Sequence, residues 1–283
     1  MSAEALSPPE VVERDGLILA LGASTLNVVR TLGDLTLFVG ELCSWLMAGW
    51  PRRGLLLPCL YQVGVQSVPV IFVTGGFIGM VIAMQSYPQF RMMHMETNLG
   101  AVINVSLVKE LGPVLASIML AGRVGCAMAA ELGTMRITEQ MDALHALGAH
   151  PVKHLAVPRL VACLIMVPLL NIVADTAGMF GGWLLTTQVF GVHSLHYWNH
   201  SDVYVGYFEL LSGLVKSTIF GGALAVIACH RGFRCNPGAE GVGRAATEAF
   251  VYSFIAILGL DFLLGVIANH VYDILWPGWM RMV

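Results

Sequence analysis

The side chains most able to do chemistry in this sequence are charged groups inside otherwise apolar stretches. They are the basic residues Lys109, Arg123 and Lys216 and the acidic residues Glu110, Asp175, Glu209 and Asp261. A charge at the centre of a bilayer costs roughly 2.5 to 3.5 kcal/mol on insertion scales, so it usually faces the protein interior or a water-filled cavity. Two interpretations remain open. Lys109 with Glu110, or Lys216 with Asp261, form ion pairs that fix helix packing, or these groups line a cavity and take part in conformational change.

Other chemical groups are less promising. The three lysines, Lys109, Lys153 and Lys216, each follow a valine, so the Gly-Lys-Ser/Thr signature of a phosphate-binding loop is missing and we do not expect an enzyme that hydrolyses ATP. His193, His196 and His200 are spaced three and four residues apart, as metal ligands on a helix can be, but they fall in a predicted loop and we expect no metal there. The six cysteines lack CxxC spacing and are expected to be free thiols.

Composition indicates that helices crossing a membrane position these groups. Hydrophobic residues make up 57% of the chain and charged residues 12%, and residues 54–90 contain no Asp, Glu, Lys or Arg. About 20 apolar residues are enough to cross a bilayer. We predict an all-α polytopic membrane protein with about five spans, at about 60–87, 100–132, 155–190, 207–230 and 248–272. No basic patch interleaved with aromatic residues is present, so no nucleic-acid partner is expected.

The N-terminal region has a different character. Residues 1–16 are polar, contain Pro8 and Pro9 and carry acids instead of a basic leader, so we expect a disordered tail and no signal peptide. Residues 17–53 mix charged and apolar side chains, which favours an amphipathic helix at the membrane interface over a full span. Residues 54–283 then form the membrane domain.

The distribution of Lys and Arg predicts the orientation, because cytoplasmic loops carry an excess of both. If residues 1–60, 133–159 and 231–247 share one side, ten basic residues lie there: Arg14, Arg30, Arg52, Arg53, Arg136, Lys153, Arg159, Arg231, Arg234 and Arg244. The opposite side holds only Arg91 and Arg281. We therefore expect a cytoplasmic N-terminus and, after an odd number of spans, a C-terminus outside the cytoplasm.

The polar segment "AAELGTMRITEQMDALHALGAHP", residues 129–151, falls on the predicted cytoplasmic side. Thr134 can cap the start of a helix and Gly148 can stop it, which predicts a helix at 135–147. Ile137, Met141 and Leu144 follow the i, i+4, i+7 spacing of one apolar face. Such a helix lies flat at the membrane surface. It is either a solvated connector or a docking surface for a soluble partner.

A family resemblance bears on this choice. "KELGPVLASIMLAGRVGCAMAAELGTMRITEQMDALHALGAHPVKHLAVPR", residues 109–159, resembles the signature region of the MlaE/YrbE family of ABC-transporter permeases, as do "GGFIGMVIAMQSY", "ETNLG" and "GLDFLL". The resemblance implies a phospholipid transporter of the bacterial inner membrane that maintains outer-membrane lipid asymmetry. It also implies a homodimer, a cytoplasmic ATPase that binds ATP and Mg, a periplasmic MCE-domain lipid-binding protein and a STAS-domain protein.

The resemblance also implies roles for individual residues. The coupling helix that contacts the ATPase falls on residues 136–147, with Arg136, Glu139, Met141 and Asp142 as the residues expected to make contact. The lipid cavity and its gate fall on Tyr87, Lys109, Glu110, Lys216 and Asp261. Position 109 departs from the more usual arginine, and a lysine cannot hold a phosphate in a bidentate manner.

One alternative remains from the residues themselves. A proton-coupled secondary transporter could use Glu110 or Asp261 as a proton relay, as buried carboxylates do in such proteins. This class needs no cytoplasmic amphipathic helix, and the inverted repeat common in it is not visible in the sequence. A membrane-embedded enzyme is a more distant alternative, because no nucleophile or metal constellation is visible.

Overall fold

The computed structural model describes residues 17–49 and 51–275, and these contain helices but no strands. Five helical segments of the described chain are long and apolar enough to cross a membrane, so the prediction of an all-α polytopic protein is confirmed. They are Arg53–Met92, Glu96–Ile137, Val152–Gln188, Tyr207–Phe233 and Ala239–Tyr272. The predicted disordered tail at 1–16 lies outside the described residues.

The chain divides into two units, Met1–Glu41 and Leu42–Val283. Helix α1 (Leu17–Ala48) begins in the first unit and ends in the second. It is a single helix of 32 residues in the region where an interfacial helix is predicted, and it is not one of the five apolar segments. Its position at the membrane interface stays a prediction.

The first apolar segment is broken near its start. Helix α2 (Arg53–Val63) ends at Gly64, a short 3-10 turn η1 (Val65–Ser67) follows, and α3 (Val68–Met92) completes the segment. Pro69 falls in the first turn of α3, where its missing amide hydrogen costs no helical bond. The helical segment therefore begins before the predicted residue 60 and contains a bend that apolar composition alone did not reveal.

The second apolar segment contains two π-helical turns. Its elements are η2 (Glu96–Asn98), α4 (Leu99–Ser106), the π-turn η3 (Leu107–Leu111), α5 (Gly112–Leu120), the π-turn η4 (Ala121–Gly125) and α6 (Cys126–Ile137). In η3 the amide of Gly112 donates to the carbonyl of Leu107, five residues back. Lys109 and Glu110 lie in η3 and Arg123 lies in η4, so three of the intramembrane charges sit on these turns. Such π-bulges are often found at functional sites.

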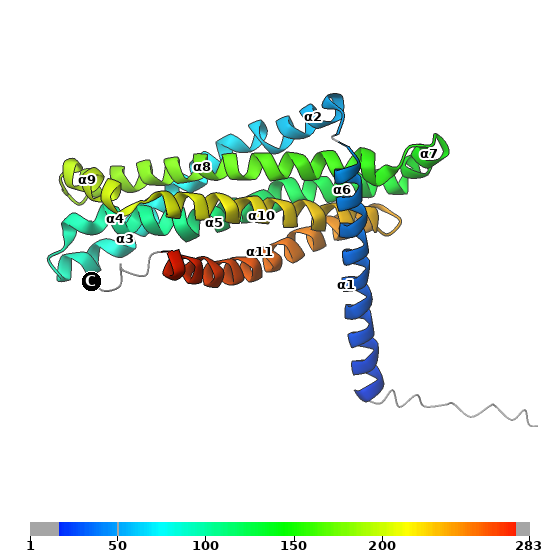
Figure 1. Ribbon diagram of the computed structural model, residues 1–283, viewed down its shortest axis with the longest axis horizontal. Coiled ribbons are helices and arrows are strands. Elements are labelled where there is room, and N and C mark those ends of the chain that lie inside the picture. The colour runs from blue at the N-terminus through cyan, green and yellow to red at the C-terminus, as the bar shows by residue number, and fades with distance from the viewer. Residues whose placement is uncertain (1–16, 50, 276–283) are drawn as a thin grey trace, which may run out of the picture. The chain divides into compact units, whose positions relative to one another are not determined.

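The remaining helices complete the bundle. Helix α7 (Gln140–Ala146) is followed by the π-turn η5 (Val152–Ala156) and by α8 (Val157–Gln188), and then come α9 (Ser194–Tyr204), α10 (Tyr207–Phe233) and α11 (Ala239–Leu275). Within the second unit, α5, α8 and α10 run side by side, with α7 at one end and α9 at the other (Figure 1). These two ends are called the α7 end and the α9 end.

Helices α3 and α8 pack so closely that their backbones touch. A methyl group on Gly79 would lie 1.8 Å from the carbonyl oxygen of Gly178, and one on Gly75 would lie 2.6 Å from that of Ala174. Small residues at these positions are what allow helix backbones to approach in a membrane protein. The glycines of the first span therefore make a packing surface.

Helix α11 contrasts with α8 in how little of it the chain covers. In the most apolar 18-residue window of each segment, 56% of the α8 residues but only 11% of the α11 residues are buried. Phe262, Leu263 and Ile267 are among the large apolar side chains that α11 leaves exposed. A face of this kind must contact lipid or another protein.

Candidate functional site

A buried lysine joins three helical segments inside the bundle. Lys216 of α10 places its Nζ 2.5 Å from Glu110 Oε2 of η3 and 2.9 Å from Asp261 Oδ1 of α11. The lysine side chain is 3% exposed, while those of Asp261 and Glu110 are 23% and 41% exposed. These three residues are called the ion network. Because one cation serves two carboxylates, the network ties the second span to the last two.

The predicted pairing of these charges is half right. The pair of Lys216 with Asp261 is confirmed, but the pair of Lys109 with Glu110 is wrong. Lys109 Nζ instead donates to the amide oxygen of Asn269 on α11, over 3.1 Å. Consecutive residues of a helix do not face each other, so Lys109 and Glu110 reach different partners.

An apolar groove lies beside the ion network, between α10 and α11. Its volume is about 230 Å³, and Val215, Leu264 and Ile267 are among the side chains that line it together with Lys216. Gly265 of α11 turns toward the network, since a methyl group there would lie 3.8 Å from Lys216 Nζ and 3.9 Å from Glu110 Oε1. The groove thus presents an apolar wall with Lys216 of the ion network at its edge.

Tyr87 lies in a different cluster. Its ring stacks on Phe190 with 3.9 Å between centroids and an angle of 3°, and the Arg91 guanidinium lies 6.0 Å from the ring centroid. Tyr87 also packs against a buried cluster that includes Leu99 and Tyr197. The contacts of Tyr87 therefore do not bring it to the ion network, and its place at a lipid cavity stays a prediction.

The segment predicted as one helix at 135–147 is two helices with a break between them. Helix α6 continues to Ile137, and Glu139 takes a left-handed backbone conformation, with φ of 58°, before α7 begins at Gln140. Thr134 does not cap a helix, because it lies inside α6 and its hydroxyl donates to the Ala130 carbonyl over 2.9 Å. Thr138 likewise donates to the Thr134 carbonyl over 2.8 Å. The predicted helix start is therefore wrong.

The end of that segment is as predicted. Gly148 has φ of 74°, and its amide donates to the His145 carbonyl. The amide of Ala149 donates to the Leu144 carbonyl. These two bonds form the Schellman motif, in which a glycine in the left-handed region ends a helix.

The residues expected to contact an ATPase differ in exposure. Arg136, Glu139 and Asp142 are exposed, whereas Met141 is only 7% exposed. Met141 therefore anchors α7 to the bundle from its inner face. The outer face of the α6–α7 junction carries a mixture of one basic and two acidic side chains that are free to meet a partner.

Comparison with known proteins places this arrangement in a family. The family model described as Permease MlaE matches residues 56–267, which include η3, α10, most of α11 and the α6–α7 junction. The chain belongs to the MlaE permease family. It is therefore an ABC-transporter permease and a multi-pass membrane protein.

This chain has relatives over most of its length. It is 38% identical over 245 residues to a probable ABC transporter permease protein of Rickettsia felis, covering 87% of this chain and 95% of that protein. It is 34% identical over 255 residues to the intermembrane phospholipid transport system permease protein MlaE of Haemophilus influenzae, covering 88% of this chain and 96% of that protein. A probable ABC transporter permease protein of Synechocystis is 36% identical over 225 residues, covering 80% and 86%.

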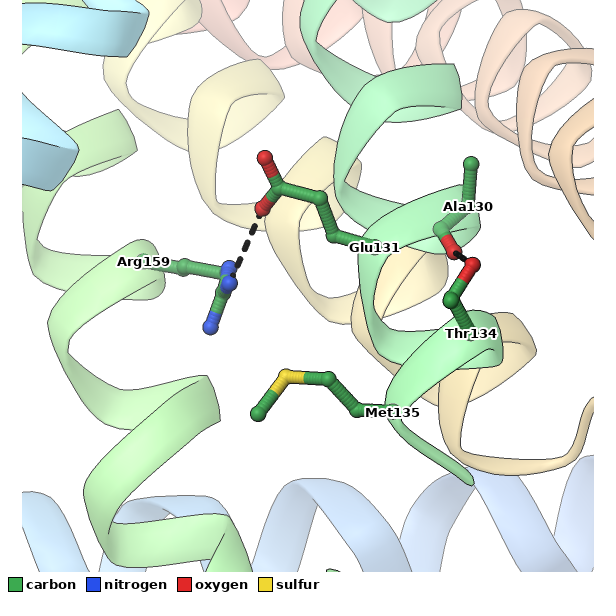
Figure 2. Close-up of a pocket in the computed structure, with 5 residues that line it drawn as sticks. All are labelled: Ala130, Glu131, Thr134, Met135 and Arg159. Atoms are coloured by element: carbon green, nitrogen blue, oxygen red, sulfur yellow. Dashed lines mark hydrogen bonds and ion pairs between the residues drawn. The ribbon is translucent and has the colours of Figure 1, made fainter. Parts of the chain in front are cut away.

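A further ion pair, which the sequence did not predict, joins α6 to α8 in this permease. Arg159 Nη2 of α8 lies 3.0 Å from Glu131 Oε2 of α6, and Gln62 Nε2 of α2 donates to Glu131 Oε1 over 2.7 Å. Figure 2 shows Glu131 and Met135 pointing from α6 toward α8, at a pocket of about 430 Å³. Both charges stand at span ends in the sequence, but their pairing depends on how three helices meet.

Arg123 of the MlaE permease binds the break in the first span. Its guanidinium donates to the Ser67 hydroxyl, to the Gln62 carbonyl over 3.4 Å and to Gln66 Oε1 over 3.3 Å. All three partners are neutral and lie at the end of α2 or in η1. A cation at a helix C-terminus satisfies free carbonyls and complements the helix dipole. Arg123 is therefore a structural cap.

The histidine spacing finds no support as a metal site. Among the described residues, no group of three or more His, Cys, Asp or Glu side chains is arranged to hold a metal ion. The side chains of His196 and His200 lie outside that description, so the expected absence of metal stays a prediction. All six cysteines are free thiols, as expected.

Proposed function

We propose that this MlaE permease is the membrane subunit of an ABC-type intermembrane phospholipid transporter that maintains outer-membrane lipid asymmetry, in the bacterial inner membrane. The observation that carries the proposal is the match to the Haemophilus protein of that name, which covers 88% of this chain and 96% of that protein. A separate cytoplasmic ATPase binds ATP and Mg. A periplasmic MCE-domain lipid-binding protein and a STAS-domain protein are further proposed partners.

Two copies of the permease enclose the lipid path in this proposal. The uncovered apolar face of α11 supports it, since the span that the chain covers least is suited to contact with a second copy and with acyl chains. The groove of about 230 Å³ beside Lys216 is smaller than typical sites for small molecules, which are roughly 300–1,000 Å³. One chain alone therefore holds only part of a lipid, and two facing copies complete the cavity.

The ion network acts as a gate or brace for that cavity. Lys216 holds η3 and α11 together through Glu110 and Asp261, so a movement of α11 away from α10 would separate charges in a low-dielectric region. Because of that cost, we expect α10 and α11 to adopt two distinct arrangements, one with the ion pairs formed and one with them broken, and few intermediate positions. Lys109 adds a second link to α11 through Asn269. Tyr87 contributes to the same lipid path at the α9 end.

Helix α7 is the coupling helix: the ATPase binds it and moves the spans through it. Arg136, Glu139 and Asp142 offer exposed charges to the partner, and buried Met141 passes a force on α7 to the bundle. The pair of Glu131 with its α8 partner continues that path. In this orientation α7 and the N-terminus are cytoplasmic and the C-terminus is periplasmic, as the excess of Lys and Arg predicts.

The alternative of a proton-coupled secondary transporter receives less support. Its relay would be Glu110 or Asp261, and a carboxylate oxygen of each accepts a hydrogen bond from Lys216. Each acid is therefore held in an ion pair with the same lysine. A shared ion pair that joins three helical segments is suited to a structural role.

Co-purification tests the coupling role of α7. The permease is expressed with its ATPase, and the complex is isolated in mild detergent. The double variant E139K/D142K reverses two exposed charges, so we expect the folded permease to lose the ATPase while its thermal stability stays unchanged. The M141L variant is the matched control, because it keeps an apolar anchor and should retain the ATPase. Retention of the ATPase by E139K/D142K would contradict the coupling role.

Photocrosslinking tests the lipid path. A photoreactive residue is placed at position 87, at Ile267 in the groove, or at Phe72, an exposed side chain of α3 outside the predicted site. We expect positions 87 and 267 to capture phospholipid from membranes several-fold more strongly than position 72. Equal labelling at all three positions would remove the support for a specific cavity.

A further inference from the structure

Asp175 is a buried acid for which the ion network and the coupling path provide no role. It lies on α8 inside the third span and is 6% exposed. Its Oδ2 accepts a hydrogen bond from Asn171 Nδ2 over 3.0 Å, while its Oδ1 and the Asn171 Oδ1 are buried without a partner. No Lys, Arg or His in the described part of the chain is bonded to it.

The unpartnered oxygen of Asp175 points at the second span. A methyl group on Gly112, the first residue of α5, would lie 1.9 Å from Asp175 Oδ1 and 2.8 Å from the carbonyl oxygen of Leu107. Both oxygens therefore flank the same point above Gly112. Only a glycine leaves room there for the carboxyl group to reach the backbone of η3.

The backbone carbonyl groups of η3 can accept more hydrogen bonds than the helix itself supplies. The Gly112 amide already donates to the Leu107 carbonyl in the π pattern, and Pro113, the next residue in line, has no amide hydrogen to give. A carbonyl oxygen has two lone pairs, so Leu107 can accept a second bond. The freed carbonyl of Val108 turns to α10, where a methyl group on Gly213 would lie 2.5 Å from it. The backbone of the π-turn thus presents carbonyl acceptors toward its neighbours.

We propose that Asp175 is held as the neutral carboxylic acid and donates its proton to the η3 backbone at Leu107, which makes it the positioning residue for the turn that carries Glu110. A charged carboxylate buried without a cation is very costly, and protonation removes the charge while supplying the donor that the site lacks. The proposal does not depend on what the permease transports.

The charged groups near this site are already engaged. In η3, Lys109 donates a hydrogen bond to Asn269, and Glu110 accepts one from Lys216 of α10. Helix α3, which packs on α8, contains no Asp, Glu, Lys or Arg between residues 68 and 90. A neutral acid is therefore the form of Asp175 that fits η3, α10 and α3.

Infrared spectroscopy of the full-length permease in lipid bilayers at neutral pH tests the protonation directly. A protonated carboxyl has a carbonyl stretch well separated from that of a carboxylate, and ¹³C-labelling of aspartate shifts only the aspartate bands. We expect a label-sensitive acid band in the wild type and in D261N, and its loss in D175N. If the labelled wild type and D261N show no acid band, the proposal is wrong, and this result does not depend on whether D175N folds.

A set of size variants tests the geometry, with the thermal midpoint in detergent as the measurement. D175N keeps a neutral donor of the same shape, so we expect a midpoint close to that of the wild type, whereas D175A loses the bond and should unfold clearly earlier. G112A should be severely destabilised, and D175A/G112A should recover part of the loss because the added methyl group enters the vacated space. G122A is the control, since a methyl group there meets nothing closer than 3.5 Å.

Two outcomes of these variants would overturn the proposal. If D175N were as damaging as D175A, the negative charge of Asp175 and not its proton would be what the site needs. If G112A were as mild as G122A, the carboxyl oxygen would not occupy the space above the turn.

Discussion

Replacing Lys216 with methionine removes the cation that both Glu110 and Asp261 contact, while keeping a long unbranched side chain in the same space. The two carboxylates then remain near each other without a counter-charge in a low-dielectric part of the membrane domain. Removing one partner of a buried ion pair typically costs about 3–5 kcal/mol, because the charge left behind is uncompensated.

From the exposure of the two acids, we expect the loss of stability in K216M to lie at the lower end of that range. Lys216 is almost completely buried, but Glu110 and Asp261 are 41% and 23% exposed, so the charge left behind is less enclosed than in a fully buried ion pair. We therefore expect K216M to lower the free energy of unfolding by about 3 kcal/mol. The triple variant E110Q/K216M/D261N has no charge to compensate and should lie within about 1 kcal/mol of the wild type, since neutral replacement of a whole buried ion network is often harmless.

Unfolding in mixed micelles of a mild detergent and increasing dodecyl sulfate measures both quantities, with helical circular dichroism as the signal. A K216M variant as stable as the wild type would show that the network contributes nothing. A triple variant as unstable as K216M would show that the loss arises from packing around position 216 and not from uncompensated charge. Either result would refute the electrostatic reasoning.

Two further predictions concern packing and hydrogen bonding outside the network. G79A should destabilise the permease by about 1–3 kcal/mol or more, because its methyl group would meet the Gly178 carbonyl oxygen at 1.8 Å. G76A is the control: its methyl group would meet nothing closer than 3.7 Å, so we expect little loss when the thermal midpoints of both variants are measured in detergent. Y197F should cost about 1–3 kcal/mol, because the Tyr197 hydroxyl donates to Asn104 Oδ1 over 3.0 Å inside the bundle. Burial raises the pKa of Tyr197, so the wild type should lose stability as the pH rises above about 10, where an unfolded tyrosine ionises, and Y197F should lack that part of the loss.

Periodicity and charge counting predict much of this fold. Apolar runs of about 20 residues have few alternatives to membrane helices, so five spans can be inferred from composition alone. Gly148 ends its helix as expected, because a glycine after an amphipathic stretch has a specific backbone role. Lys216 and Asp261 pair because a lone buried lysine needs an acid.

Features that depend on contact between distant helices could not be predicted in this way. Before the break at Glu139, Thr134 and Thr138 bond back to their own helix instead of capping the next one, and both options are open to a threonine in the sequence. The three π-turns η3, η4 and η5 each add one residue to a helical turn without a clear change in composition. Arg159 pairs with Glu131 across 28 residues, and only the packing of α6 on α8 brings them together.

Vesicles that contain the permease and its ATPase test the central proposal most directly. Fluorescent phospholipid is placed in donor membranes, and its transfer is followed with ATP, without ATP, with a catalytically inactive ATPase, and with an imposed proton gradient alone. We predict transfer that requires ATP and an active ATPase and that is unaffected by the proton gradient. Transfer driven by the gradient in the absence of ATP, or no ATP-dependent transfer by an intact complex, would contradict the account.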